Sequence, residues 1–290
     1  MSIDFDICFI MAAGMGTRMG TIGQILPKPL WPVNNKVLLD LQVSYAKDLG
    51  AKKIFINTHY KASEIEKYIN HYYKDINVIF EKELLDIGGG LENLKNIVKR
   101  GRVLILNSDQ LLFFDKDISL TAGSAANLVC VPADPNEKYN KTILDNGKVV
   151  GIEKFHDKMS DYYTYSGISL VDLQYITSGT TPKKFFNDTL DFTKHQILAT
   201  KLSEFEYFDF GTKERYLKSL IKLNRNLASN QSTYSTMFYQ KNLKFDGKLD
   251  FYHHKDWCES LEEVFGMKLK ITNENDIYNL SLDDRSDSII

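Results

Sequence analysis

The chain has 290 residues, of which 43% are hydrophobic, and it carries a net charge of -2 with an isoelectric point near 6.3. This length allows one large domain or a domain with an extension, while the near-neutral charge excludes a broad basic surface for nucleic acid or an anionic membrane. No apolar run reaches the roughly 18 residues of a bilayer span, and the amino terminus lacks the basic residues of a signal peptide, so we expect a cytoplasmic protein. The three cysteines lack metal-ligand spacing, and we expect their thiols to be reduced.

A predicted strand over residues 7–11 runs into a loop of small residues. The loop consists of Ala12, Ala13, Gly14, Met15, Gly16 and Thr17 and is followed by Arg18. Open α/β sheets bind ligands where strands end in such loops. Glycine lets backbone N–H groups approach an anion, Arg18 supplies a fork of donors, and Lys28, between two prolines, adds a second cation. The combination predicts a polyphosphate site, although it fits neither a Walker loop nor a dinucleotide fingerprint.

Strands and helices then alternate. Periodicity predicts strands over 53–57, 76–80 and 103–106, and helices over 37–49, after a capping box of Ser63 and Glu66, and after the glycine run 88–90. This alternation predicts the α/β class, with a three-layer, doubly wound, mostly parallel mixed sheet of Rossmann-like type.

The pattern changes in the second half. We expect a strand over 127–132, a hairpin over 142–154 that turns at Asn146-Gly147, and a strand over 162–171. Two short helices are expected between 182 and 201, followed by a strand over 206–210. This half should elaborate the first with a mixed sheet.

The composition becomes more polar after residue 217, so we divide the chain into a domain over 1–217 and a C-terminal extension over 218–290. A short helix is expected over 255–265 and a loose acidic end over 281–290. The adjacent His253 and His254 are expected to be solvated side chains and not metal ligands. No hexapeptide repeat is present, and the extension is a candidate surface for self-association into a homo-oligomer.

Two acids follow predicted strands. Asp109 comes after residues 103–106, and Asp209 lies near the end of 206–210. Mg²⁺ prefers one or two carboxylates together with phosphate oxygens. Either acid alone is equally explained as a turn former or a helix cap, but the pair in matching positions predicts a magnesium site.

Seven segments carry a family resemblance. In chain order they are AAGMGTRM, PKPLWPV, LLDIGGGL, LNSD, GIEKF, TYSGISLV and FDFGTKERY. Together they resemble the sugar-1-phosphate nucleotidyltransferases, most closely the N-acetylmuramate-1-phosphate uridylyltransferase and mannose-1-phosphate guanylyltransferase branch. Ser108 departs from the glycine that is usual in that family before the metal aspartate, and Phe210-Gly211 is a milder departure.

The resemblance implies roles for particular residues. Those implied to bind the nucleotide are Ala12, Ala13, Gly14, Gly16, Thr17, Arg18, Gly88 and Gly89. Those implied to bind the sugar phosphate are Glu153, Lys154 and Gly167, and the implied Mg²⁺ ligands are Asp109 and Asp209. Arg18 and Lys28 are implied to be catalytic, on the departing pyrophosphate and the reacting phosphate.

The resemblance also implies the reaction, which transfers a nucleoside monophosphate from a triphosphate to a sugar 1-phosphate for cell-envelope polysaccharide. UTP with N-acetylmuramate 1-phosphate or a related hexose 1-phosphate is favoured. GTP with mannose or heptose 1-phosphate, CTP-dependent transfer and a non-sugar acceptor such as phosphocholine stay open. A glycosyltransferase would need an Asp-x-Asp motif, but residue 111 is Leu. Besides the nucleotidyltransferase and the glycosyltransferase, the third alternative is a non-catalytic protein that senses sugar nucleotides.

Overall fold

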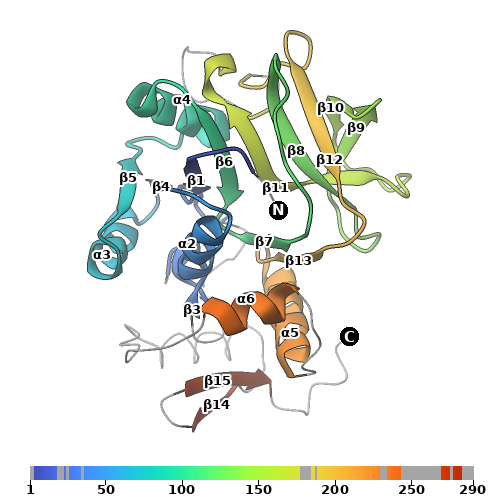
Figure 1. Ribbon diagram of the computed structural model, residues 1–290. Coiled ribbons are helices and arrows are strands. Elements are labelled where there is room, and N and C mark those ends of the chain that lie inside the picture. Colours follow the sequence, from blue (N-terminus) through green and yellow to red (C-terminus); the bar gives the residue numbers. More distant parts are fainter. Residues whose placement is uncertain are drawn as a thin grey trace.

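A computed structural model describes residues 3–17, 23, 26–33, 36–176, 184–186, 188–228, 234–242, 269–274 and 277–282. At its centre is a nine-stranded sheet (Figure 1). In spatial order the strands are β5 (Ile76–Phe80), β4 (Lys53–Thr58), β1 (Ile7–Met11), β6 (Arg102–Asn107), β11 (Tyr163–Asp172), β8 (Ser124–Pro132), β12 (Gln196–Lys201), β10 (Lys148–Glu153) and β9 (Lys141–Asp145).

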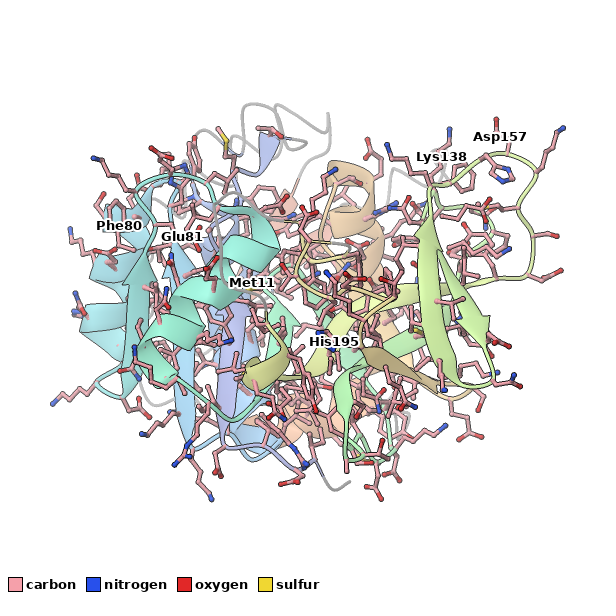
Figure 2. The ribbon with its side chains drawn as sticks, turned by 90° about the horizontal axis from the view of Figure 1, so that it is seen from above. Met11, Phe80, Glu81, Lys138, Asp157 and His195 are labelled. Carbon is pink, nitrogen blue, oxygen red and sulfur yellow. The ribbon has the colours of Figure 1, made fainter. Side chains whose placement is uncertain are left out.

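The sheet has two different halves. Strands β5, β4, β1 and β6 are all parallel, whereas in the second half only β12 and β8 pair in parallel. β11 joins the halves, because it pairs antiparallel with both β6 and β8. Phe80 and Glu81 therefore lie at one end of the sheet and Lys138 and Asp157 at the other, with Met11 between them (Figure 2).

Helices cover both faces of the parallel half. The helices are α2 (Leu38–Asp48), α3 (Ala62–Tyr72) and α4 (Asp86–Val98). Alternate residues of β1 point to opposite faces, so that Cys8 and Ile10 pack in the core beneath α2 and α3, and Ile7 and Phe9 in the core beneath α4. The predicted three-layer α/β architecture with a mixed sheet is confirmed (Figure 1).

Two helix starts differ from the prediction. α3 begins after Lys61, which adopts φ 49°, so Ser63 lies inside the helix and not at its cap. Glu66 instead accepts a hydrogen bond from Thr58 of β4 at 3.1 Å, so this contact to the sheet replaces the expected capping box. α4 begins at Asp86 and includes the glycine run.

In the second half the Asn146-Gly147 turn is confirmed, because both residues have positive φ (46° and 79°), as a type I′ turn requires. The short helices expected before residue 201 are wrong over 196–201. These residues form β12, which lies between β8 and β10. Pairing on both sides buries Ile197 to 1% exposure, and this tertiary context outweighs a weak local preference.

A small second sheet lies beside the main one and pairs β7 (Gln110–Phe113) with β13 (Glu206–Asp209). α5 (Lys213–Ala228) contacts β13 and α6 (Tyr234–Asn242), so the predicted boundary at 217/218 falls within α5. β14 (Leu269–Glu274) and β15 (Ile277–Leu282) form a hairpin. The predicted helix over 255–265, His253 and His254 lie outside the described residues. Among the described helices, none combines the length and apolar character needed to cross a bilayer.

Candidate active site

The glycine loop follows β1 and is fixed to the neighbouring strand. The amide of Ala12 donates to Asn57 Oδ1 at the end of β4, at 2.7 Å. Gly16 adopts φ 63°, a conformation that favours glycine, whereas a Cβ on Gly14 would meet nothing within 4 Å. The loop therefore presents backbone groups to an open space.

That space, here called the loop cavity, contains most of the predicted nucleotide residues. Its lining includes Ala12, Ala13, Gly14, Gly16, Thr17, Lys28, Ser108 and Asp109. Arg18 lies outside the described residues. Gly88 and Gly89 are buried in the first turn of α4 and do not line the cavity, although the preceding Asp86 and Ile87 do.

Lys28 lies in a short 3₁₀ turn, η2 (Lys28–Leu30), whose position is set by its neighbour Trp31. The Trp31 side chain is fully buried, donates through Nε1 to the Leu26 carbonyl, and packs edge-on against Tyr216 of α5. Lys28 Nζ donates to Asp109 Oδ2 at 2.6 Å and to the Gly211 carbonyl at 3.5 Å. The PKPLW segment is thereby joined to both acidic segments.

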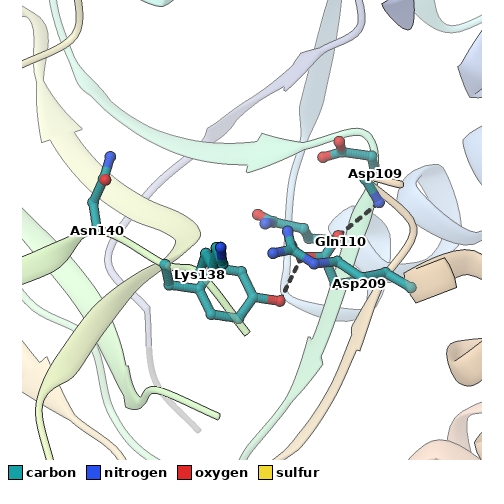
Figure 3. Close-up of a pocket in the computed structure, with 8 residues that line it drawn as sticks. Asp109, Gln110, Lys138, Asn140 and Asp209 are labelled. Carbon is teal, nitrogen blue, oxygen red and sulfur yellow. Dashed lines mark hydrogen bonds and ion pairs between the residues drawn. The ribbon is translucent and has the colours of Figure 1, made fainter. Parts of the chain in front are cut away.

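The two predicted metal ligands are neighbours across the small sheet. Asp209 of β13 pairs with Gln110 of β7, and the amide of Phe210 donates to the Asp109 carbonyl at 2.9 Å. Both acids line a second cavity, here called the acid cavity, with Gln110, Lys138, Tyr139, Asn140, Gly211 and Arg215. Figure 3 shows Asp109, Gln110 and Asp209 grouped on one side of this cavity and Asn140 on the other. Asp109 and Gly211 line both cavities, which are therefore adjacent.

Asp209 is held by three donors. The Gly211 amide donates to Oδ1 at 2.6 Å, while Tyr139 Oη and Arg215 Nη1 donate to Oδ2 at 2.7 and 3.2 Å. Burial and repulsion from Asp109 nevertheless raise the pKa of Asp209 above its ordinary value. The charged form of Asp209 is thus held at an energetic cost.

Arg215 connects this site to a loop from the far half of the sheet. Its Nε donates to Glu137 Oε2 at 2.8 Å, and its guanidinium lies 4.3 Å from the centre of the Tyr139 ring. Burial opposes ionisation of Glu137, but hydrogen bonds from Arg215 and Lys218 lower its pKa overall. Burial and the Asp209 carboxylate raise the pKa of Tyr139, which keeps its hydroxyl protonated as a donor.

The carboxylate oxygens of Asp109 and Asp209 suit a divalent cation. A carboxylate has about four lone-pair positions. Three donors contact Asp209 and one contacts Asp109, so positions are left on both residues. The mutual repulsion of the two carboxylates favours a cation between them. Two carboxylates completed by phosphate oxygens suit Mg²⁺, although no cluster of three or more His, Cys, Asp or Glu occurs in the described part of the chain.

None of the three predicted sugar-phosphate residues lines either cavity. Glu153 lies 3.4 Å from His156 and 3.8 Å from Lys141, and Lys154 is exposed. Gly167 lies closer to the site, because its bare Cα adjoins Asn107 and Gln110. The structure thus brings together the glycine loop, Lys28 and both acids, and leaves Glu153 and Lys154 on the outer hairpin.

A buried polar chain supports the loop cavity. Asn57 Nδ2 donates to Glu81 Oε1 at 2.8 Å, and both side chains are 1% exposed. Burial raises the pKa of Glu81 despite the hydrogen bonds that it accepts from Asn57 and Leu85. A Cβ on Gly90 would come within 2.9 Å of Glu81 and 3.0 Å of Asn57, so this glycine gives the pair its room.

Several lining residues were missed from the sequence. Asn57 and Asn107 are each the polar residue near the end of an apolar strand, which is a usable signal for the ligand edge of an open sheet. Tyr139 has no such local signal, because it reaches the site only through tertiary packing of a loop 70 residues from Asp209. Arg215 lies in the segment FDFGTKERY, six residues after Asp209, and its place in that segment was a usable signal.

Two relatives of known name match most of the chain. The D-glycero-alpha-D-manno-heptose 1-phosphate guanylyltransferase of Aneurinibacillus thermoaerophilus is 25% identical over 224 residues, which cover 72% of this chain and 95% of that protein. The protein of the same name from Campylobacter jejuni is 27% identical over 220 residues, covering 73% and 97%.

Among solved structures, HddC from Yersinia pseudotuberculosis complexed with GMP-PN superposes with a TM-score of 0.63 at 22% identity, covering 74% of this chain and 98% of that one. This likeness confirms the fold. Residues 7–158, more than half of the chain, match the family described as Nucleotidyl transferase. These residues include the glycine loop, Lys28 and Asp109, and the chain therefore belongs to the nucleotidyl transferase family.

Proposed function

We propose that the protein transfers GMP from GTP to a sugar 1-phosphate and releases pyrophosphate. One observation carries the proposal. The glycine loop, Lys28 and the two carboxylates border adjacent cavities that meet at Asp109 and Gly211. A triphosphate in the loop cavity would thus have its reacting end beside the acid cavity, where an acceptor has access.

The residues suit phosphoryl transfer between two anions. A sugar phosphate is already ionised near neutral pH, so the acceptor oxygen needs no general base. The difficulty is repulsion between phosphates, which Lys28 and Arg18 would offset by binding the reacting phosphate and the leaving pyrophosphate. Asp109 and Asp209 would hold Mg²⁺, which supplies positive charge to the phosphate oxygens.

The choice of base rests on the relatives and on the cavity. The expected preference for UTP and N-acetylmuramate 1-phosphate has no support among the relatives described above, which are named guanylyltransferases. Two carboxylates, Glu81 and Asp86, line the loop cavity. Glu81 is buried and already accepts hydrogen bonds from Asn57 and Leu85, so the exposed Asp86 is the acidic acceptor that a base can reach. Guanine presents two adjacent donors, N1–H and its amino group, whereas uracil presents one, so acidic residues favour guanine.

For the acceptor, we propose a heptose 1-phosphate, because both relatives described above are named for one, or mannose 1-phosphate, which shares the manno configuration in that name. The non-catalytic alternative rests on Ser108. This residue is 7% exposed, and its amide donates to the Met11 carbonyl at 3.2 Å, so it is part of the strand-end structure. The presence of Lys28, Asp109 and Asp209 at one site favours an enzyme over a non-catalytic sensor.

The test is pyrophosphate release from GTP, UTP and CTP, each with mannose, heptose, glucose and N-acetylmuramate 1-phosphates, with and without Mg²⁺. We expect release with GTP and a mannose-type acceptor only when Mg²⁺ is present. Release with UTP alone would overturn the base assignment. If no pair releases pyrophosphate but sugar nucleotides bind, the protein is a sensor.

A further inference from the structure

An amide pair lies where the two cavities meet. Asn107, the last residue of β6, lines the loop cavity, and Gln110, the first residue of β7, lines the acid cavity. Asn107 Nδ2 donates to Gln110 Oε1 at 3.0 Å. The acceptor atom of the Gln110 amide is therefore occupied by a protein donor.

A glycine in the neighbouring strand makes room for this pair. The pairing of β11 with β8 shifts register between Tyr165 and Ser169, and within that interval Gly167 adopts φ 87°. A Cβ on Gly167 would lie 1.9 Å from Gln110 Oε1 and 2.8 Å from Asn107 Nδ2. Both the backbone conformation and the available space thus require glycine if the amide pair is to keep its place.

The backbone of Gln110 is also fixed. Gln42, which is fully buried in α2, donates through Nε2 to the Gln110 carbonyl at 2.5 Å. Two residues further along β7, the Leu112 carbonyl accepts from the hydroxyl of Tyr45. On the other side, Gln110 pairs with Asp209 of β13. The side-chain amide of Gln110 is therefore preorganised next to the carboxylates of Asp109 and Asp209.

The Gln110 Nε2 group remains as a donor on the side of the acid cavity, since no described residue accepts from it. Four other side chains in the lining can donate. Lys138 and Arg215 are cationic and suit a phosphate, whereas a neutral amide suits a hydroxyl oxygen. The Tyr139 hydroxyl already donates to Asp209, and Asn140, the other neutral amide, lies on the opposite side of the cavity from Gln110 and both carboxylates (Figure 3). We propose that Gln110 selects the sugar by donating to one of its hydroxyl groups. The inference rests on the proposed function and adds to it the residue that distinguishes sugar epimers.

The experiment measures binding of mannose, glucose and galactose 1-phosphates by calorimetry in the full chain, with GTP as the reference ligand. Mannose and galactose each differ from glucose in the configuration of a single carbon. The ratios of the three Kd values therefore measure how strongly the protein discriminates the orientation of one hydroxyl group. In Gln110→Leu we expect the Kd of the best-bound sugar phosphate to rise about tenfold, as for one lost hydrogen bond. The ratios should approach one, and the Kd for GTP should stay unchanged.

A control and a second variant separate recognition from folding. Gln196→Leu changes an exposed glutamine on β12, outside both cavities, and should leave all Kd values unchanged. Gly167→Ala displaces the amide without removing it and should weaken sugar discrimination in the same direction. A folded Gln110→Leu protein with the wild-type Kd ratios would overturn the inference.

The same data distinguish this inference from the proposed function. If wild type releases pyrophosphate but Gln110→Leu discriminates sugars as before, the proposed function stands and the role of Gln110 falls. If wild type binds hexose phosphates in a Gln110-dependent way but releases no pyrophosphate, the role of Gln110 stands and the proposed transfer falls. If wild type neither reacts with nor binds any of these sugars, both fall.

Discussion

The loop cavity and the acid cavity are adjacent but are built in different ways. The loop cavity is formed mainly by the carboxyl ends of three adjacent parallel strands, β1, β4 and β6, and the segments that follow them. The acid cavity joins three parts of the chain that are far apart in sequence: β7, the segment 138–140, and β13 with the beginning of α5. The first presents backbone groups and glycine, and the second presents balanced side-chain charges. Substitutions of the loop glycines should therefore act through backbone shape, and substitutions of Lys28 and of the acid-cavity side chains through charge.

The largest effect is expected where the cavities meet. Asp109→Asn removes one carboxylate of the proposed Mg²⁺ site and the partner of Lys28, and should lower kcat about 1000-fold, the upper end for one electrostatic group. Steady-state pyrophosphate release measures the loss, and circular dichroism checks the fold. Asp145→Asn, an exposed acid at the hairpin turn, is the matched control. Full magnesium-dependent activity in Asp109→Asn would place the ion elsewhere.

Removing the positive charge of Lys28 tests the meeting point of the two cavities from the side of the loop cavity. Lys28→Ala should cost about 2 to 4 kcal/mol of transition-state stabilisation, because a preorganised charge beside the reacting phosphate is lost. The comparison of kcat/KM with that of Lys148→Ala, an exposed lysine on β10, measures this cost. Turnover within twofold of wild type would reject the role of Lys28.

The two glycines of the loop should behave differently. Gly16 has φ 63°, so Gly16→Ala should lower the free energy of unfolding by about 1 kcal/mol, the cost of a left-handed alanine. Gly14→Ala meets no atom within 4 Å and should leave stability unchanged. Urea denaturation of both variants provides the comparison. Equal losses of stability would show that backbone conformation does not distinguish the two positions.

The smallest effect concerns Glu81. Because burial raises its pKa in the folded protein, the charged form destabilises the fold above that pKa, and the penalty disappears as pH falls and the folded state takes up a proton. Glu81→Gln should therefore be more stable than wild type near pH 7, with a difference that shrinks toward pH 4.5. Urea denaturation at several pH values measures it. A difference that grew on acidification would contradict the sign of this pKa shift.

The sequence by itself determined the parallel half and the edge of the sheet at which the glycine loop, Lys28 and the two acids lie. Residues 7–11 predict β1 from their apolar run, and the glycine loop, Lys28, Asp109 and Asp209 are recognisable because each follows a buried strand or lies between prolines. These signals are local, because the apolar pattern of a strand and the residue types of a turn both involve residues that are adjacent in sequence.

Only the tertiary structure decided which charges share a cavity. Gln196–Lys201 became a strand because β8 and β10 accept it on both sides, and Tyr139 reached Asp209 from a loop 70 residues away. Conversely, Glu153 and Lys154 remained outside both cavities. Contacts between residues far apart in sequence depend on how whole elements pack, and no local pattern of residue types contains that information.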